Sequence, residues 1–375
     1  MKPKFQRVLG VVAAGSLVAV ALVALVSESQ AAAPHQAAPH QAASQREAGF
    51  APKATQPEIV YVNGKFTNPT TRNIVTWLPS QPPNYRIVYD NSGLGQTFGN
   101  LRLPKSKAPK AGYPVVVLLH GGGWQSVWPY DYLEPFADSL TQRGIATWNI
   151  EYRRPGQRGG GWPGTFLDVA HATDFVRTLA PKFHLDLSRV VVSGQSAGGH
   201  LAVWVASRHK IPKTSPIYTP NPLPVRGVVS LDAWALDMRY DIEHGVDSAA
   251  PGTVLFDLLG VQTAEQALAR VDADGPSPTQ LLPIGTSIEL FTGTVCCYRD
   301  ANTRYAQAAA AAGDNVKLTL FRGGTHFDPV DVCGPGWPYV VTAIFNQLHE
   351  KITAKDLANP SPRLCRRMNV DQPSQ

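Results

Sequence analysis

The order of apolar and polar positions along the chain separates buried strands from amphipathic helices. Residues 113–120, YPVVVLLH, form a continuous apolar run, which is typical of a central strand covered on both faces. Residues 165–180 instead repeat their apolar side chains at helical spacing. The expected strands are 58–62, 85–90, 113–120, 145–153, 189–194, 225–232, 287–293 and 316–323, and the expected helices are 130–143, 165–180, 197–208, 301–312 and 339–354.

The alternation of strands and helices predicts the fold class α/β, with a mainly parallel sheet and helices on both faces. Residues 235–285 are less regular and are interpreted as a lid or an insertion. In open sheets of this class, ligands bind beyond the carboxyl ends of the strands. Residues that directly follow a predicted strand are therefore the candidates for chemistry.

The beginning of the chain lacks this alternation. A basic start is followed by an apolar run over residues 8–26 and by the small residues Ala31, Ala32 and Ala33. This order is typical of a cleaved signal peptide, which we place at residues 1–33. It predicts a secreted protein with no stable membrane association after cleavage. An uncleaved membrane anchor is the alternative, because the apolar run is nearly long enough to cross a bilayer.

Residues 34–57 contain the repeat APHQAAPHQAAS, which has too few apolar side chains to bury a core. This composition predicts a disordered linker, in which His35 and His40 are solvated. A folded domain is expected over residues 58–358, and a tail over residues 359–375.

The charge of the chain excludes one class of partner. The net charge is +6, from 34 basic and 28 acidic residues, which are scattered along the chain without a sustained basic run. Nucleic-acid binding proteins concentrate basic residues in a patch or stripe. We therefore expect no nucleic acid partner.

Four cysteines, Cys296, Cys297, Cys333 and Cys365, lack the spacing of a zinc finger. In an exported protein, an even number of cysteines suggests disulfides. Because joining adjacent cysteines strains the backbone, Cys296 and Cys297 are expected to pair with Cys333 and Cys365, in either order. Free buried thiols are the alternative.

The segment Gly194-Gln195-Ser196-Ala197-Gly198 follows a predicted strand and precedes a predicted helix. This is the setting that the G-x-S-x-G nucleophile turn requires, and it makes Ser196 the candidate nucleophile. The amide of Ala197, at the start of the helix, is a candidate donor to a developing oxyanion. A glycine-rich turn with an incidental serine is the alternative.

A second glycine-rich segment, His120-Gly121-Gly122-Gly123-Trp124, follows the central strand. Glycines let backbone amides approach an anionic oxygen without obstruction from side chains, so Gly122 and Gly123 join Ala197 as the expected oxyanion hole. The segment lacks the Lys-Ser/Thr ending of a phosphate-binding P-loop. His120 is interpreted as structural.

The candidate general base is His326, in the segment Arg322–Asp328 after the last core strand. A serine hydroxyl is too weakly acidic to attack unaided, so an imidazole within hydrogen-bond reach must take its proton. Five other histidines of the predicted domain are weaker candidates for the base: His171, His184, His200, His209 and His244.

Together these motifs resemble the α/β-hydrolase superfamily, and more closely its exported esterases in the carboxylesterase and arylformamidase-like branch. The resemblance covers roughly residues 86–348 and rests on HGGGW, Glu151-Tyr152-Arg153, GQSAGGHLA and GGTHFD. It implies an α/β-hydrolase fold and hydrolysis of carboxylic esters through an acyl-enzyme, without a cofactor and without a metal. Small-molecule esters are the expected partners.

The acid of the triad departs from the pattern of that branch. The resemblance would place it at Cys296, where a thiol cannot do the work of a carboxylate. Asp232 ends a predicted strand, and GVVSLDAW resembles the segment of platelet-activating-factor acetylhydrolases that carries their triad acid. We therefore expect Asp232 as the acid. Asp300 is the alternative, although its position before AQAAAAA favours a helix N-cap.

The prediction is thus a secreted serine esterase with the triad Ser196, Asp232 and His326. An exported peptidase or amidase of the same fold, and a non-catalytic binding module, are the alternatives. Four tryptophans near the expected site suggest an apolar pocket, although packing beneath the loops explains each one equally well; they are Trp124, Trp128, Trp162 and Trp234.

Overall fold

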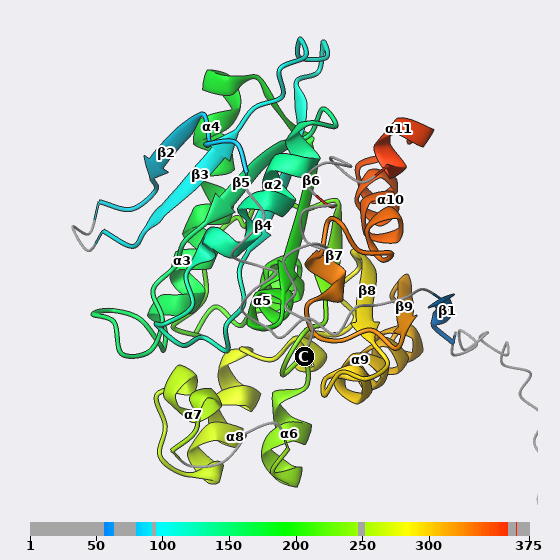
Figure 1. Cartoon of the computed structure of the whole chain (residues 1–375). Helices are drawn as coiled ribbons and strands as arrows, with labels where there is room; N and C mark the ends of the chain where they lie inside the picture. The colour runs from blue at the N-terminus through cyan, green and yellow to red at the C-terminus, as the bar shows by residue number, and fades with distance from the viewer. Residues whose placement is uncertain (1–55, 64–79, 92–94, 247–251, 359–364, 366–375) are drawn as a thin grey trace, which may run out of the picture. The chain divides into compact units, whose positions relative to one another are not determined.

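A single sheet organises the computed structural model, which describes residues 56–63, 80–91, 95–246, 252–358 and 365 (Figure 1). The expected signal peptide, most of the linker and most of the tail lie outside the described residues. The described strands form one sheet of nine in the order β1-β9-β8-β7-β6-β4-β5-β3-β2. Their bounds are β1 Glu58–Asn63, β2 Tyr85–Val88, β3 Phe98–Arg102, β4 Tyr113–Leu119, β5 Ala146–Ile150, β6 Leu185–Gln195, β7 Gly227–Leu231, β8 Ser287–Gly293 and β9 Val316–Arg322.

The expected mainly parallel sheet is confirmed. Strands β1 and β4 to β9 pair in parallel, and near one edge of the described sheet β3 pairs antiparallel with both β5 and β2. The sequence analysis missed β3, because its sequence, FGNLR, contains Gly99 and Asn100 and has no continuous apolar run. Gly99 is required there, because an added Cβ would lie 2.5 Å from the ring of Trp148.

Helices cover both faces of the sheet. Alternate residues of β4 pack into different cores, with Val115 and Val117 on one face and Val116 and Leu118 on the other. Helices α3, α4, α5 and α9 contribute to the first core, and α2 and α10 contribute to the second. The bounds of these helices are α2 Glu134–Thr141, α3 Gly164–Asp174, α4 Val176–Phe183, α5 Ala197–Ser207, α9 Arg299–Ala311 and α10 Trp337–Leu348.

Three expected helices differ from the structure by more than two residues or by a break. The helix expected over 130–143 begins with a 3-10 turn, and the one expected over 165–180 divides into α3 and α4. The helix expected over 339–354 ends at Leu348, because His349 adopts a left-handed conformation with φ 56°. The remaining short helices are η1 Tyr130–Leu133, η2 Arg208–Lys210, η3 Pro278–Leu281, η4 Asp328–Val330 and α11 Ala354–Leu357.

The described part of the irregular segment 235–285 contains three α-helices, α6 Met238–His244, α7 Val254–Leu259 and α8 Ala264–Asp274, followed by the 3-10 helix η3. They lie together at one end of the sheet, at the bottom of Figure 1. The segment is therefore a helical insertion after β7. Among the described residues, no helix combines the length and the apolar composition that a membrane crossing needs.

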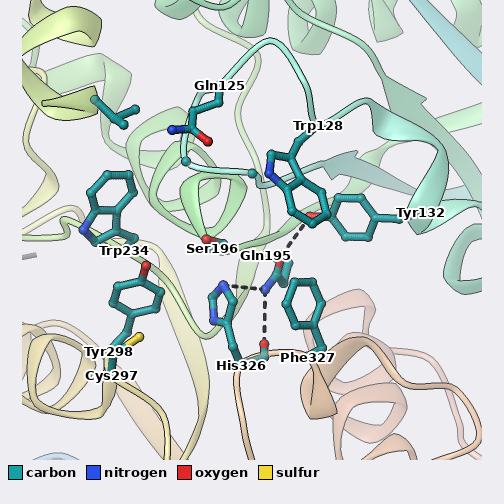
Figure 2. Close-up of a pocket in the computed structure, with 13 residues that line it drawn as sticks. Gln125, Trp128, Tyr132, Gln195, Ser196, Trp234, Cys297, Tyr298, His326 and Phe327 are labelled. Carbon is teal, nitrogen blue, oxygen red and sulfur yellow. Dashed lines mark hydrogen bonds between the residues drawn. The ribbon is translucent and has the colours of Figure 1, made fainter. Parts of the chain in front are cut away.

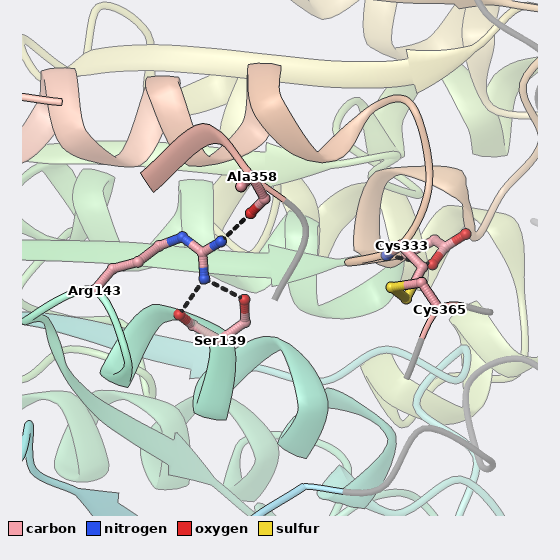
Figure 3. Close-up of a disulfide and its surroundings, with 6 residues drawn as sticks. Ser139, Arg143, Cys333, Ala358 and Cys365 are labelled. Atoms are coloured by element: carbon pink, nitrogen blue, oxygen red, sulfur yellow. Dashed lines mark hydrogen bonds between the residues drawn. A yellow bond between two sulfur atoms is a disulfide. The ribbon is translucent and has the colours of Figure 1, made fainter. Parts of the chain in front are cut away.

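The predicted disulfide pairing was wrong. Cys333 pairs with Cys365, with their Cα atoms 5.4 Å apart, and Cys296 and Cys297 are free thiols (Figure 3). The prediction failed because it assumed that each of the adjacent cysteines needed a distant partner. In the fold, the loop after β8 turns its Cys296 thiol toward Asp232 instead.

Candidate active site

Ser196 occupies a sharp turn between β6 and α5. Its backbone lies at φ 58° and ψ −125°, a conformation that is rare for a residue with a side chain. The flanking glycines are required by close backbone contact: a Cβ on Gly194 would lie 2.1 Å from the carbonyl oxygen of Gly198, and one on Gly198 would lie 2.0 Å from that of Leu119. The turn therefore holds Ser196 beyond the carboxyl end of the sheet.

A pocket of about 360 Å³ opens above this turn (Figure 2). It brings Ser196 together with His326, Gly122 and Gly123, which the sequence analysis had placed at one site. Val254 adds a side chain from the helical insertion. The remaining lining residues are Gln125, Trp128, Tyr132, Gln195, Trp234, Cys297, Tyr298 and Phe327.

Asp232 directly contacts His326. Its Oδ2 atom lies 2.6 Å from Nδ1 of His326, and Thr292 donates a hydrogen bond to the other carboxylate oxygen. The Asp232 side chain is fully buried, whereas that of His326 is 23% exposed. This contact assigns the proton on the imidazole to Nδ1 and leaves Nε2 as the acceptor.

Asp300 lies elsewhere. Its side chain is 69% exposed and pairs with Arg299 on the first turn of α9. The helix begins at Arg299 with Tyr298 as its N-cap, so the expectation that Asp300 caps the helix was wrong. Of the two candidate acids, Asp232 is the one that the fold places against the imidazole.

The loop after β4 presents two of the expected oxyanion donors to the pocket. Gly122 and Gly123 have φ angles of +95° and +58°, and a Cβ on Gly122 would lie 2.1 Å from the Cβ of Trp128. Ala197 is buried at the first position of α5, where a backbone amide has no partner within the helix. These three amides lie on the two loops that flank Ser196.

Tyr132 and Gln195 connect the two loops, and the sequence analysis missed both. The backbone amide of Gly121 donates to the Tyr132 hydroxyl, which in turn donates to Oε1 of Gln195 at 2.7 Å. Nε2 of Gln195 donates to the backbone carbonyl oxygen of His326 at 3.1 Å and also lies 3.0 Å from Nε2 of the same residue (Figure 2). The chain of contacts therefore fixes the glycine loop relative to the imidazole.

The structural interpretation of His120 agrees with its surroundings. Its ring is fully buried, stacks on Tyr152 at 4.2 Å and lies 3.0 Å from a carboxylate oxygen of Glu151. Arg154 binds the same carboxylate at 3.0 Å. Although burial opposes ionisation, the contacts with His120 and Arg154 lower the pKa of Glu151. The group is an internal ion pair that supports the loop after β4.

The other candidate bases lie away from the pocket. Burial lowers the pKa of His200 to about 4, and its Nδ1 contacts the carbonyl oxygen of Ala235 at 2.8 Å, so it packs as a neutral side chain. The remaining candidates are exposed: His171, His184, His209 and His244. His326 is the one histidine among the described residues that line the pocket.

Two of the four tryptophans line the pocket, namely Trp128 and Trp234. Trp124 is fully buried and packs against Trp234 with ring centroids 4.9 Å apart. Trp162 packs against Phe166. The expectation of an aromatic pocket therefore fits Trp128 and Trp234, whereas Trp124 and Trp162 pack against other aromatic side chains.

Two free thiols adjoin the acid and the base. Sγ of Cys296 lies 2.6 Å from Oδ2 of Asp232 and 3.7 Å from Nδ1 of His326. Sγ of Cys297 lies 3.9 Å from that of Cys296. The contact with Cys297, burial and the negative charge of Asp232 raise the pKa of Cys296, whereas the contact with Cys296 lowers that of Cys297.

Comparisons with known proteins match parts of this architecture. A family model described as BD-FAE matches residues 100–229, which include Gly122 and Ser196 and stop before Asp232. A curated relative, the non-reducing polyketide synthase atr1 of Stereocaulon alpinum, is 28% identical over 129 residues. That match covers 32% of this chain, and the chain spans only 5% of the length of the synthase.

Solved structures extend the likeness across the sheet. A truncated carbohydrate esterase from gut microbiota is 19% identical, with a TM-score of 0.59 over 71% of this chain and 95% of that one. Esterase B of Lactobacillus rhamnosis is 20% identical, with a TM-score of 0.57 over 78% and 90%. A bifunctional GH43-CE protein of Bacteroides eggerthii is 20% identical, with a TM-score of 0.57 over 70% and 37%. The chain is an α/β-hydrolase by fold.

The α/β-hydrolase fold explains where the site lies. Strands β6, β7 and β9 are parallel members of one sheet, so Ser196, Asp232 and His326 follow carboxyl ends at the same edge. The order serine, acid, histidine along the chain is the order of this superfamily. The candidate acid Asp232 follows β7, and Thr292 of β8 donates a hydrogen bond to it.

Proposed function

We propose that the protein is a serine hydrolase that cleaves carboxylic esters through an acyl-enzyme. The observation that carries the proposal is the contact of Asp232 with Nδ1 of His326, in a pocket that Ser196 also lines. The esterases among the similar solved structures support the same reaction class. We also propose that the chain is exported, on the sequence of its first residues alone.

The proposed reaction has two halves. Oγ of Ser196 attacks the acyl carbon while Nε2 of His326 takes the hydroxyl proton, and the imidazolium returns this proton to the leaving alkoxide. Water then attacks the acyl-enzyme with the same histidine as its base, which releases the carboxylic acid and restores Ser196. Asp232 holds the tautomer in which Nε2 carries the lone pair and stabilises the imidazolium, and the Ser196 hydroxyl must replace the Gln195 amide at Nε2.

The backbone amides are proposed to stabilise the tetrahedral intermediate. Negative charge develops on the former carbonyl oxygen, and donors in a site with little water stabilise it more than water does. We expect the amides of Gly122, Gly123 and Ala197 to donate to that oxygen: Gly122 and Gly123 line the pocket with Ser196, and Ala197 directly follows Ser196 at the start of α5.

The experiment is the hydrolysis of p-nitrophenyl esters from acetate to palmitate by the mature chain and its Ser196→Ala variant. Ser207→Ala is the matched control, because it makes the same change at the far end of α5. We expect hydrolysis by the control and a rate near background for Ser196→Ala. A pocket of about 360 Å³ predicts faster cleavage of short esters than of palmitate. Equal ester hydrolysis by the Ser196→Ala variant would contradict the proposal.

A further inference from the structure

The proposed reaction leaves two side chains of the site unused. Cys296 and Cys297 are free thiols in the loop after β8, while the disulfide of the described chain joins Cys333 to Cys365. Cys297 lines the pocket, and Cys296 contacts both the acid and the base. Thiolate, imidazole and carboxylate are the three protein ligands that Zn²⁺ takes most often.

We propose that Asp232, Cys296, Cys297 and His326 form a binding site for a soft divalent cation of the zinc class, and that its occupancy stops the hydrolase. The binding part of this inference stands on the cluster of Asp232, Cys296 and His326, with Cys297 adjoining Cys296. The inhibition part rests on the proposed function.

The distances between the sulfur and nitrogen atoms fit a tetrahedral ion. Bonds of about 2.3 Å to sulfur and about 2.0 Å to nitrogen place two sulfur ligands about 3.8 Å apart, and a sulfur and a nitrogen about 3.5 Å apart. The Sγ atoms of Cys296 and Cys297 lie 3.9 Å apart, and Sγ of Cys296 lies 3.7 Å from Nδ1 of His326. The ligand atoms of Asp232, Cys296 and His326 all lie within 4.8 Å of one another.

The carboxylate and the Cys297 thiol are the ligands that must move, since Cys297 is not among the side chains whose ligand atoms all lie within 4.8 Å of one another. Oδ2 of Asp232 lies 2.6 Å from both Nδ1 of His326 and Sγ of Cys296, because hydrogen bonds join them. Around a zinc ion these separations would widen to roughly 3.3 and 3.5 Å. Binding therefore exchanges two hydrogen bonds for metal bonds at the same three atoms. The hydrogen bond from Thr292 remains available to the other carboxylate oxygen.

The proton balance explains why occupancy stops catalysis. The ion takes two thiolates, so the thiols release up to two protons, and the Nδ1 proton of neutral His326 moves to Nε2. No bond is oxidised or reduced. With Nε2 protonated and Nδ1 bound to the metal, His326 has no lone pair with which to accept the proton of Ser196.

The pocket gives the ion a path to the site. Cys297 is exposed, Cys296 and His326 are partly exposed, and Asp232 is buried behind them. The ion would thus meet the sulfur and nitrogen ligands first and the carboxylate last. A chelator that enters the pocket would remove it by the same route, so inhibition should be reversible.

The experiment titrates the chain, metal-free and with Cys296 and Cys297 reduced, with Co²⁺ and Zn²⁺. We expect one ion per chain by equilibrium dialysis and a thiolate-to-cobalt charge-transfer band. Cys297→Ser should weaken binding at least 10-fold, and the double variant with Cys296→Ser should lose the band. The Ser196→Ala variant should bind the metal ion as tightly as the wild type does, so metal binding can be measured even if the chain does not hydrolyse esters. Circular dichroism checks that each variant folds.

The activity readout separates metal binding from thiol oxidation. We expect Zn²⁺ to abolish ester hydrolysis by the wild type, and a chelator to restore it without any reductant. Restoration by a reductant and not by a chelator would indicate a disulfide between Cys296 and Cys297 and would overturn the metal site. No binding, or equal binding by the double cysteine variant, would also overturn it, because the ligands would then be absent or elsewhere.

Discussion

Oδ2 of Asp232 lies 2.6 Å from Nδ1 of His326, although 94 residues separate them along the chain. The contact exists because β7, β8 and β9 are adjacent and parallel, so that the loops after β7 and β9 meet across the end of β8. Asp232 is locked there by its backbone amide, which donates to the carbonyl oxygen of Phe291 at 2.5 Å. The proposed acid is therefore positioned by the sheet, whereas His326 is positioned by a loop.

Asp232→Asn tests this assignment against its rival. The amide no longer holds the imidazole in the tautomer that leaves Nε2 free, so kcat for an ester substrate should fall by about three to four orders of magnitude. Asp300→Asn makes the same change on the exposed face of α9 and should leave kcat within about twofold. If the Asp300 variant were the inactive one, the assignment of the acid would be wrong.

Tyr132→Phe tests the link between the glycine loop and the base. It leaves the amide of Gly121 and Oε1 of Gln195 without their buried partner, which should lower the free energy of unfolding by about 1–3 kcal/mol. We expect kcat to fall as well, since the loop and His326 lose their connection. Denaturant unfolding and steady-state kinetics measure the two effects. Tyr130→Phe, on the same 3-10 helix but with a partly exposed ring, should change kcat little; an equal loss there would contradict the link.

Replacing Cys333 and Cys365 together by alanine should lower the free energy of unfolding and leave kcat for an ester substrate unchanged. The bond closes a loop of 32 residues, for which chain entropy predicts a loss of about 3–4 kcal/mol. Arg143 also holds this end of the chain, because it donates to the carbonyl oxygen of Asp356. It donates to that of Ala358 as well (Figure 3). Unfolding in urea measures the loss, and kcat at 25 °C should match the wild type. A large fall in kcat with unchanged stability would contradict this prediction.

The raised pKa of the buried Asp331 carboxyl predicts that the stability of the fold depends on pH. Burial, opposed by backbone hydrogen bonds from Cys333 and Gly334 and assisted by Asp328, raises the pKa of Asp331 from 3.8 to about 6. The folded chain therefore binds more protons between about pH 4 and 6, and the free energy of unfolding falls as the pH rises through this window.

Asp331→Asn removes that ionisation. The free energy of unfolding of the variant should exceed that of the wild type by up to about 3 kcal/mol at pH 8, and the two should be equal at pH 3.5. Its amide oxygen can still accept the hydrogen bond from the backbone of Cys333. Melting temperatures over this pH range measure the effect, with Asp131→Asn at an exposed position as the control. An equal gain at both ends of the range would show that the charge is not the cause.

The sequence predicted the parts of the site that local chemistry encodes. The turn at Ser196 needs two glycines because its backbone makes close contacts, and a pattern of glycines is visible in a sequence. The central strands were equally visible, because burial on both faces requires continuous apolar runs such as that of β4. Asp232 was predicted from its place at the end of a strand and from the resemblance of GVVSLDAW to platelet-activating-factor acetylhydrolases, and the fold places it against His326.

Features that depend on tertiary contacts were missed. The pairing of Cys333 with Cys365 follows from the path of the chain after η4, which no spacing rule encodes. Gln195 occupies a position that the nucleophile motif leaves free, and its role depends on Tyr132 from another loop. A buried tyrosine that follows the glycine loop in the sequence was the one available signal. Strand β3 was missed because its partner β5 supplies the apolar surface that Gly99 lacks.

The central claim is that Ser196 is a nucleophile activated by His326. The most direct measurement is the intact mass of the chain after reaction with a fluorophosphonate, followed by mapping of the labelled peptide. The account predicts one adduct per chain, located on Ser196, absent from Ser196→Ala and formed far more slowly by His326→Ala. No adduct on the folded wild-type chain, or an adduct that persists in Ser196→Ala, would contradict it.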